Sequence, residues 1–398
     1  MLLGRRPAVA LYLVAIGLLP WQWFPPFPGL QEHAQWSDVF LAAAAVAWVW
    51  ERRRDRSWPR LGIVHGGLAV YLAASAASVV VSSKRHEGAL LWLGMVELVV
   101  LFVLTADLAG DRAVRRDLVR VVAVSSLAAA AVALGGLLLF YAGHTTRLIG
   151  EYGRLKASSR YARVEGTFFN QSLLGDFCVF AAAVVAMEDE ALPARVRRAV
   201  HGALAVAVLI TFSRPILGFV VAAAVRTRRR GLAVATATLA VAALAIGTLS
   251  SVSLDPTNPA EARLGNGTAT YRQAAETSLK SLAHHPLLGV GLGELPGRVF
   301  KRVPARAHFT LIDVGATQGL VALAGLAVFA VALWRGRRLP TDVAVWSGIA
   351  GIAVNSLALD VEHFRHVWVL FGLAVAARRV GPDDRDEAVV LVPSPPAG

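Results

Sequence analysis

Four short stretches of the sequence place arginine or histidine beside small residues at the edges of apolar segments. They are 163–172, with Arg163 and Asn170; 211–215, with Arg214; 270–293, with Arg272; and 306–319, with Arg306, His308 and Gly319. Arginine binds phosphate oxygens through paired hydrogen bonds, and histidine exchanges a proton near neutral pH. Each residue alone also fits a solvated loop or a helix cap. Together they predict an anion site that includes a general base.

The composition shows what kind of protein carries these stretches. Of 398 residues, 56% are hydrophobic and 17% are charged, and the mean hydropathy is +0.56. This is more apolar than soluble domains, so we expect an integral membrane protein and exclude a disordered, collagen-like or disulfide-stapled chain. The net charge of +13 comes from scattered residues without one aromatic-rich patch, which argues against nucleic-acid binding. Cys178 is the only cysteine, so no intramolecular disulfide or cysteine-based metal site is possible.

Apolar runs recur along the chain and predict an all-α, polytopic transmembrane bundle of about 12 spans. The runs are 7–24, 38–50, 61–82, 88–108, 118–142, 168–187, 199–213, 215–225, 231–252, 309–334, 342–359 and 366–377. Each should be helical, because hydrocarbon offers no partner to a free backbone amide. We expect one transmembrane domain over 1–377, which includes a long outer loop at 253–308. The tail 378–398, with mixed charge and proline, should be disordered.

The basic residues predict an orientation. With the N-terminus inside, the inner segments hold 24 of the 40 lysines and arginines, and the short outer loops hold four. This distribution follows the positive-inside rule and places both termini in the cytoplasm. The other 12 lie in the long outer segments 143–167 and 253–308. Most of them fit solvated charge, but they also supply the cations that an outward-facing diphosphate site needs.

The four stretches resemble a known family, the O-antigen ligase and O-antigen polymerase superfamily of bacterial inner-membrane glycosyltransferases. The similar features are Arg163 with Gly166 to Asn170, Ser213-Arg214, Arg272 upstream of His285-Pro286-Leu287-Leu288-Gly289-Val290-Gly291, and His308 upstream of Gly319. They follow the family order over about 163–335. The chain departs from the family pattern at Phe309, Thr317 and Glu276.

The resemblance implies a reaction on the periplasmic face of the bacterial inner membrane. An undecaprenyl-diphosphate-linked glycan would be the donor, and a sugar hydroxyl, on a glycan or on lipid A core, would be the acceptor. Arg214 and Arg272 would hold the diphosphate, His308 would contact or deprotonate the acceptor, and Arg163, Asn170 and Arg306 would bind substrate. The family requires no cofactor and no metal. A ligase is favoured narrowly over a polymerase, and a flippase of lipid-linked sugars is the rival from another class.

Three further features have both a structural and a functional interpretation. Gly315 and Gly319 are four residues apart, which suits close helix packing. Asp176 is a carboxylate inside an apolar run, and 360–366 is a charged cluster between two runs. Ionisable residues in such places are often functional, so both are candidates to line the site.

Overall fold

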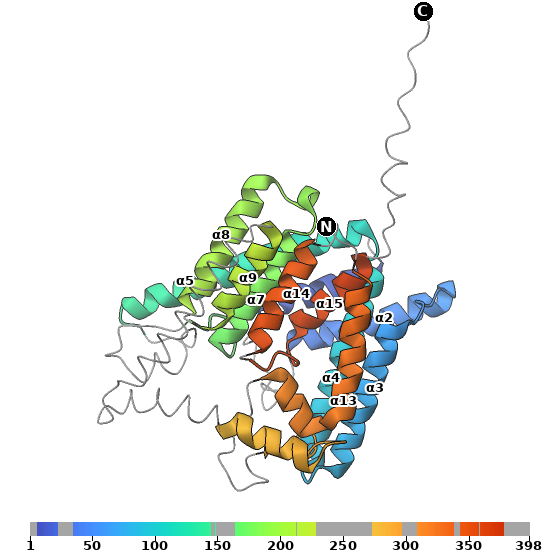
Figure 1. Cartoon of the computed structure of the whole chain (residues 1–398). Coiled ribbons are helices and arrows are strands. Elements are labelled where there is room, and N and C mark those ends of the chain that lie inside the picture. The colour runs from blue at the N-terminus through green and yellow to red at the C-terminus, as the bar shows by residue number, and fades with distance from the viewer. Residues whose placement is uncertain are drawn as a thin grey trace, which may run out of the picture.

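The computed structural model describes residues 6–22, 35–144, 148, 164–211, 213–227, 273–296, 309–337, 343–357 and 359–377 (Figure 1). The helices are α1 (Pro7–Leu18), α2 (Trp36–Asp55), α3 (Ile63–Val81), α4 (Arg85–Leu108), α5 (Arg112–Tyr141), α7 (Gln171–Val185), α8 (Ala194–Ile210), α9 (Pro215–Thr227), α13 (Thr310–Arg335), α14 (Val343–Ser356) and α15 (Arg365–Ala376), with the short η1 (Asp189–Ala191). Residues 273–284 form a further helical segment. Eleven of the twelve predicted runs coincide with a helix. The run 231–252, the tail 378–398 and most of the loop 253–308 lie outside the described residues.

The apolar helices indicate a membrane protein, as the composition predicts. Among the described residues, α3, α4, α5 and α13 are long and apolar enough to cross a bilayer, and α1, α7, α9, α14 and α15 are shorter apolar helices. Large apolar side chains such as Leu93, Val124 and Leu138 are more than half exposed, as expected for surfaces that face lipid. The number of spans, the membrane and the orientation stay predictions.

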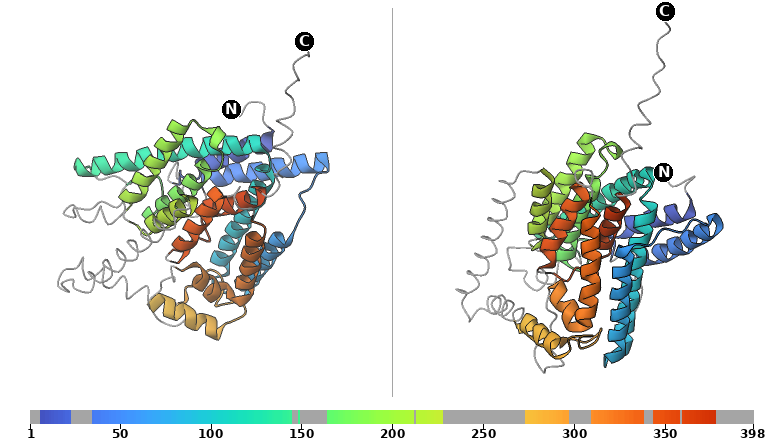
Figure 2. Two further views of the ribbon diagram at one scale, coloured as in Figure 1. Left: turned by 45° about the horizontal axis from the view of Figure 1, so that its top comes forward. Right: turned by 45° about the vertical axis from the view of Figure 1, so that its right-hand side comes forward.

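The helices form two groups that α15 joins. α3 and α13 pack along most of their length, and α4 lies beside α3, whereas α7, α9 and α14 form the second group. α15 contacts α4 and α13 in the first group and α7 and α14 in the second. α2 and α5 run across the direction of α3, α4 and α13 (Figures 1 and 2). The described helices are therefore not one set of parallel rods.

Glycines allow the closest helix contacts. A Cβ on Gly67 of α3 would lie 2.6 Å from the Phe329 nitrogen, and a Cβ on Gly325 of α13 would lie 2.6 Å from the Tyr71 nitrogen. Backbones can approach this closely only where side chains are absent. The α3–α13 pair is thus held at short range, which fixes the polar residues that the two helices share.

The arginine-rich helix ends are tied to acidic residues. Arg52 at the end of α2 pairs with Asp107 at the end of α4, and Arg115 of α5 pairs with Glu188 at an Nε–Oε1 distance of 2.8 Å. Asp111 caps α5 by accepting a hydrogen bond from the Ala113 amide at 2.8 Å. These contacts join segments that the charge pattern assigns to the same side of the membrane. We call this part of the molecule, where α2, α4 and α13 end and α3 begins, the basic end.

Candidate functional site

The first two of the four stretches lie side by side. The Val164 amide donates to the Ile210 carbonyl at 3.4 Å. A Cβ on Gly175 of α7 would lie 2.8 Å from Pro215 Cβ, at the start of α9. The turn between α8 and α9, which carries the half-buried Arg214, therefore packs against the first turns of α7. Proline suits the first position of a helix, which explains why α9 starts directly after the arginine.

The third and fourth stretches meet at a break in α13. Gly319 has φ 83° and ψ −179°, a conformation that is essentially restricted to glycine. The segment 285–294 lies along the break: the Leu320 amide donates to the Pro286 carbonyl at 2.7 Å, and the Val290 amide donates to the Ala316 carbonyl at 2.9 Å. Non-helical backbone in an apolar environment needs such replacement partners. Gly319 does allow the close packing that its spacing from Gly315 predicts, because a Cβ there would overlap the Leu287 carbonyl oxygen, but it packs at a break in the helix and against a loop.

Glycines let the segment 285–294 approach its neighbours closely. Gly289, Gly291 and Gly293 all have positive φ. A Cβ on Gly289 would lie 2.6 Å from the Gln318 nitrogen. The loop therefore lies directly against the broken helix at Gly289. A Cβ on Gly291 would lie 2.5 Å from Ser82 at the end of α3, and a Cβ on Gly293 would lie 2.7 Å from the Gly88 nitrogen of α4.

Serines of α3 complete the polar contacts of the break. Ser78 Oγ donates to the Thr317 carbonyl at 2.8 Å and accepts from the Leu292 amide at 2.8 Å, so one hydroxyl joins α3, α13 and the loop. One turn earlier, the Ser75 hydroxyl lies 2.6 Å from Gln318 Oε1. The backbone groups released at Gly319 are thereby partly satisfied by side chains.

Glu362 forms a buried polar centre beside the break. Its Oε1 accepts from Tyr71 Oη and from Gln318 Nε2, each at 3.0 Å. The Glu362 carbonyl accepts from Trp368 Nε1 at 2.8 Å, which holds the backbone in place. The residue is only 8% exposed. Buried carboxylates are tolerated where such donors replace water.

Asp176 forms a second buried polar centre in the other helix group. Its Oδ2 lies 2.9 Å from His366 Nε2, and its Oδ1 accepts from Asn355 Nδ2. All three side chains are buried. The rings of Phe177 and Phe180 pack on the imidazole, with centroid distances of 5.8 and 5.7 Å. Because Asp176 follows Gly175 directly, this centre lies next to the turn that carries Arg214.

The segment 359–366, between α14 and α15, connects both centres. Glu362 reaches α3 and α13, and His366 reaches α7. Between them, Arg365 Nε lies 2.7 Å from Asp38 Oδ1 of α2 and 3.4 Å from Glu97 Oε1 of α4. One short segment therefore makes polar contacts with five helices, and Figure 1 shows it in the middle of the molecule. The sequence marked both 360–366 and Asp176 as candidates, but it did not indicate that they meet.

The predicted site residues are only partly within the described structure. Arg214 and Asn170 lie on neighbouring elements, whereas Arg163, Arg272, Arg306 and His308 fall outside the described residues. Asn170 caps α7, because its Oδ1 accepts from the Ser172 amide at 2.7 Å. The capping bond uses the side-chain oxygen and leaves the predicted substrate contact untested. Within the described residues, no cluster of three or more His, Cys, Asp or Glu side chains is arranged to hold a metal.

Comparison with known protein families finds no family that matches this chain, and comparison with curated proteins finds no similar protein.

Proposed function

We propose that this protein is a membrane glycosyltransferase that moves a glycan from a polyprenyl diphosphate to a sugar hydroxyl. The observation that carries the proposal is the pairing of the four stretches. Gly175, just after the first stretch, packs on Pro215 of the second, and the third packs on the fourth at Gly289 and Gly319. The segment 359–366 contacts residues adjacent to both pairs. Stretches that lie up to about 150 residues apart in the sequence are thus linked through contacts with the same segment, 359–366.

The chemistry assigns a role to each cationic residue. The bond between the anomeric carbon and the diphosphate oxygen breaks, and the acceptor oxygen forms a new bond to that carbon. Arg214 and Arg272 stabilise the charge that develops on the leaving diphosphate, which is most effective at a low-dielectric boundary. His308 takes the proton of the attacking hydroxyl. Arg163, Asn170 and Arg306 bind the substrates in this proposal, and no metal or nucleotide takes part.

The site belongs, in this proposal, to the periplasmic side of a bacterial inner membrane, with both termini in the cytoplasm. The described contacts support this arrangement, because arginine-rich segments assigned to the cytoplasm pair with one another at the basic end. The Arg214 turn and the α7 start belong to the opposite side in the same assignment. The acceptor is lipid A core for a ligase and a growing glycan for a polymerase.

A reconstituted reaction tests the function. Purified protein receives a defined undecaprenyl-diphosphate glycan together with either acceptor, and the products are separated on a gel. A single shift of the lipid A core acceptor supports the ligase, and a ladder of repeats supports the polymerase. No transfer to either acceptor, from protein that elutes as a folded species, would contradict the proposal.

Two variants test the assigned roles. His308→Ala should abolish transfer while the protein stays folded and inserted. The matched control is His86→Ala, because His86 is exposed at the start of α4 on the same predicted side and has no assigned role. Arg272→Lys keeps the charge but loses the two-pronged geometry, so donor turnover should fall. Equal activity of His308→Ala and His86→Ala would remove the histidine from the mechanism.

A transporter of lipid-linked sugars is a second candidate, favoured by one observation. Transporters bind substrates at discontinuous helices, and α13 is interrupted at Gly319 beside the buried Glu362. A liposome assay separates the two functions. A transporter moves the labelled donor across the bilayer and leaves its diphosphate bond intact, whereas a transferase releases the lipid diphosphate.

A further inference from the structure

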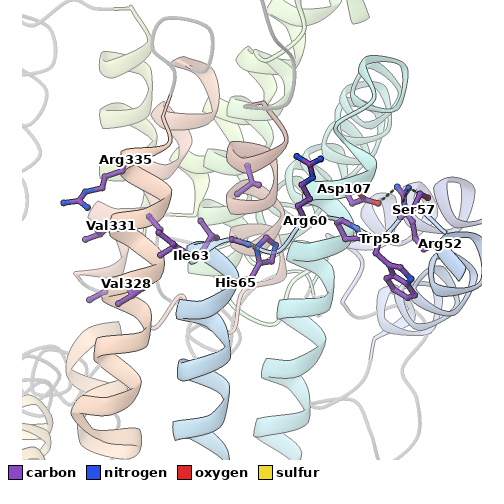
Figure 3. A pocket seen from close by; sticks show the side chains of 16 residues that line it. Arg52, Ser57, Trp58, Arg60, Ile63, His65, Asp107, Val328, Val331 and Arg335 are labelled. Atoms are coloured by element: carbon purple, nitrogen blue, oxygen red, sulfur yellow. Dashed lines mark hydrogen bonds and ion pairs between the residues drawn. The ribbon is translucent and has the colours of Figure 1, made fainter. Parts of the chain in front are cut away.

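A large groove opens at the basic end, away from the four stretches. It has a volume of about 1110 Å³ and lies between the loop from α2 to α3, the start of α3 and the last turns of α13. Figure 3 shows its lining side chains. The arginines are Arg52, Arg60 and Arg335, and the apolar walls include Ile63, Val328 and Val331. The groove therefore combines cations with a long apolar surface.

The groove carries positive charge that the described residues do not neutralise. Arg52 is held in place, because it pairs with Asp107 and donates to Ser57 Oγ at 3.0 Å. Asp107 also accepts from Trp48 Nε1 at 2.8 Å. Arg60 and Arg335 are exposed and make no hydrogen bond or ion pair with any described residue. Within the part of the chain that the structure describes, these two guanidinium groups are therefore not paired with a carboxylate.

The walls below these cations are apolar and exposed. Val328 is 45% exposed, Val331 50% and Ile63 74%. In Figure 3 Arg335 lies on α13 above Val331 and Val328, whereas Arg60 and Arg52 lie across the groove from it. The Trp58 ring at the rim packs edge-on against Trp48, at a centroid distance of 5.9 Å. Tryptophan concentrates where a bilayer meets water.

We propose that this groove binds an anionic phospholipid. The phosphate contacts Arg335, and an acyl chain covers Val331 and Val328, which lie one and two turns before Arg335 on the same helix. Basic pockets between membrane helices recognise anionic headgroups in this way. A free phosphate would satisfy Arg335 but would leave the apolar walls uncovered, so a lipid is the ligand that fits both parts. The proposal is independent of the glycosyltransferase function.

Native mass spectrometry of the detergent-purified protein tests the proposal, with phosphatidylglycerol and phosphatidylcholine added at equal concentration. The wild type should retain phosphatidylglycerol in clear excess. Arg335→Gln should weaken its binding about fivefold, as expected for one arginine at an anionic lipid. The matched control is Arg198→Gln, which removes an exposed arginine of α8 outside the groove. It should change binding less than about twofold.

A second variant keeps the charge and blocks the apolar part. Val331→Trp should reduce retention of phosphatidylglycerol although all three arginines remain. Equal retention of both lipids by the wild type would overturn the proposal, as would unchanged phosphatidylglycerol retention in Val331→Trp. Equal losses of phosphatidylglycerol binding in Arg335→Gln and Arg198→Gln would show that the effect of charge is not specific to the groove, and would also overturn the proposal. Full competition by glycerol 1-phosphate would assign the site to a soluble anion instead.

Discussion

Replacement of Gly319 by alanine should destabilise the protein by about 2–6 kcal/mol. The backbone angles at Gly319 are essentially inaccessible to alanine, which costs about 1–3 kcal/mol. An added Cβ would also lie within 2.5 Å of the Leu288 nitrogen. Relief of this overlap displaces 286–290 and weakens the bonds from the Leu320 and Val290 amides, at about 0.5–1.5 kcal/mol each. The sum is a large part of a typical total of about 5–15 kcal/mol.

Two control glycines separate the contributions. Gly143 also has positive φ, at 86°, but nothing lies within 4 Å of an added Cβ. Gly143→Ala should therefore show the backbone strain alone, about 1–3 kcal/mol. Gly94 is helical with open space around it, so Gly94→Ala should be neutral or stabilising by up to about 1 kcal/mol.

The assay is equilibrium unfolding in mixed micelles, followed by circular dichroism as the fraction of denaturing detergent rises. The predicted order of stability is Gly94→Ala, then Gly143→Ala, then Gly319→Ala. If Gly319→Ala and Gly94→Ala unfold at the same fraction of denaturing detergent, α13 is continuous in the protein and the account of the break fails.

Three further predictions concern the buried centres and the arginine turn. Asp176→Leu should lower the free energy of unfolding by about 3–5 kcal/mol, because it leaves His366 buried without its partner. In a double-mutant cycle, the addition of His366→Leu should recover part of this loss, whereas additive losses would argue against the pair. Tyr71→Phe should lower the free energy of unfolding by about 1–3 kcal/mol in the same assay, because the Glu362 carboxylate loses the Tyr71 hydroxyl as a donor; an unchanged midpoint would mean that water replaces the hydroxyl. Arg214→Lys should lower donor turnover at least about tenfold through loss of the two-pronged phosphate contact, and it should shift unfolding by less than about 1 kcal/mol; unimpaired turnover would remove Arg214 from the site.

Hydropathy predicted the helices well, because a backbone in apolar surroundings must satisfy its hydrogen bonds within the run itself. The runs 199–213 and 215–225 illustrate this: the helices α8 and α9 end and begin within a few residues of the Ser213-Arg214-Pro215 boundary. The run 309–334 was also predicted as one helix, and α13 covers it. Hydropathy carries no information on φ, so the break at Gly319 went unpredicted. Gly289 was the available signal, because it supplies the backbone that lies against the break.

Long-range partners were beyond the reach of the sequence. Asp176 was recognised as a carboxylate in an apolar run, but His366 lies 190 residues away and Asn355 lies 179 away. Nothing in local spacing links such residues, since their contact depends on how α7, α14 and α15 pack. The same holds for Glu362 and Tyr71, which are 291 residues apart. The sequence marked where buried charge would occur, and the fold decided which groups satisfy it.

The most direct test of the central claim is release of undecaprenyl diphosphate from a labelled glycan donor, measured by mass spectrometry with purified protein and acceptor. The account predicts one lipid diphosphate released for each glycan transferred, with the release greatly reduced in Arg214→Lys. A donor that stays intact with the wild-type protein, or one that crosses the bilayer without cleavage, would contradict it.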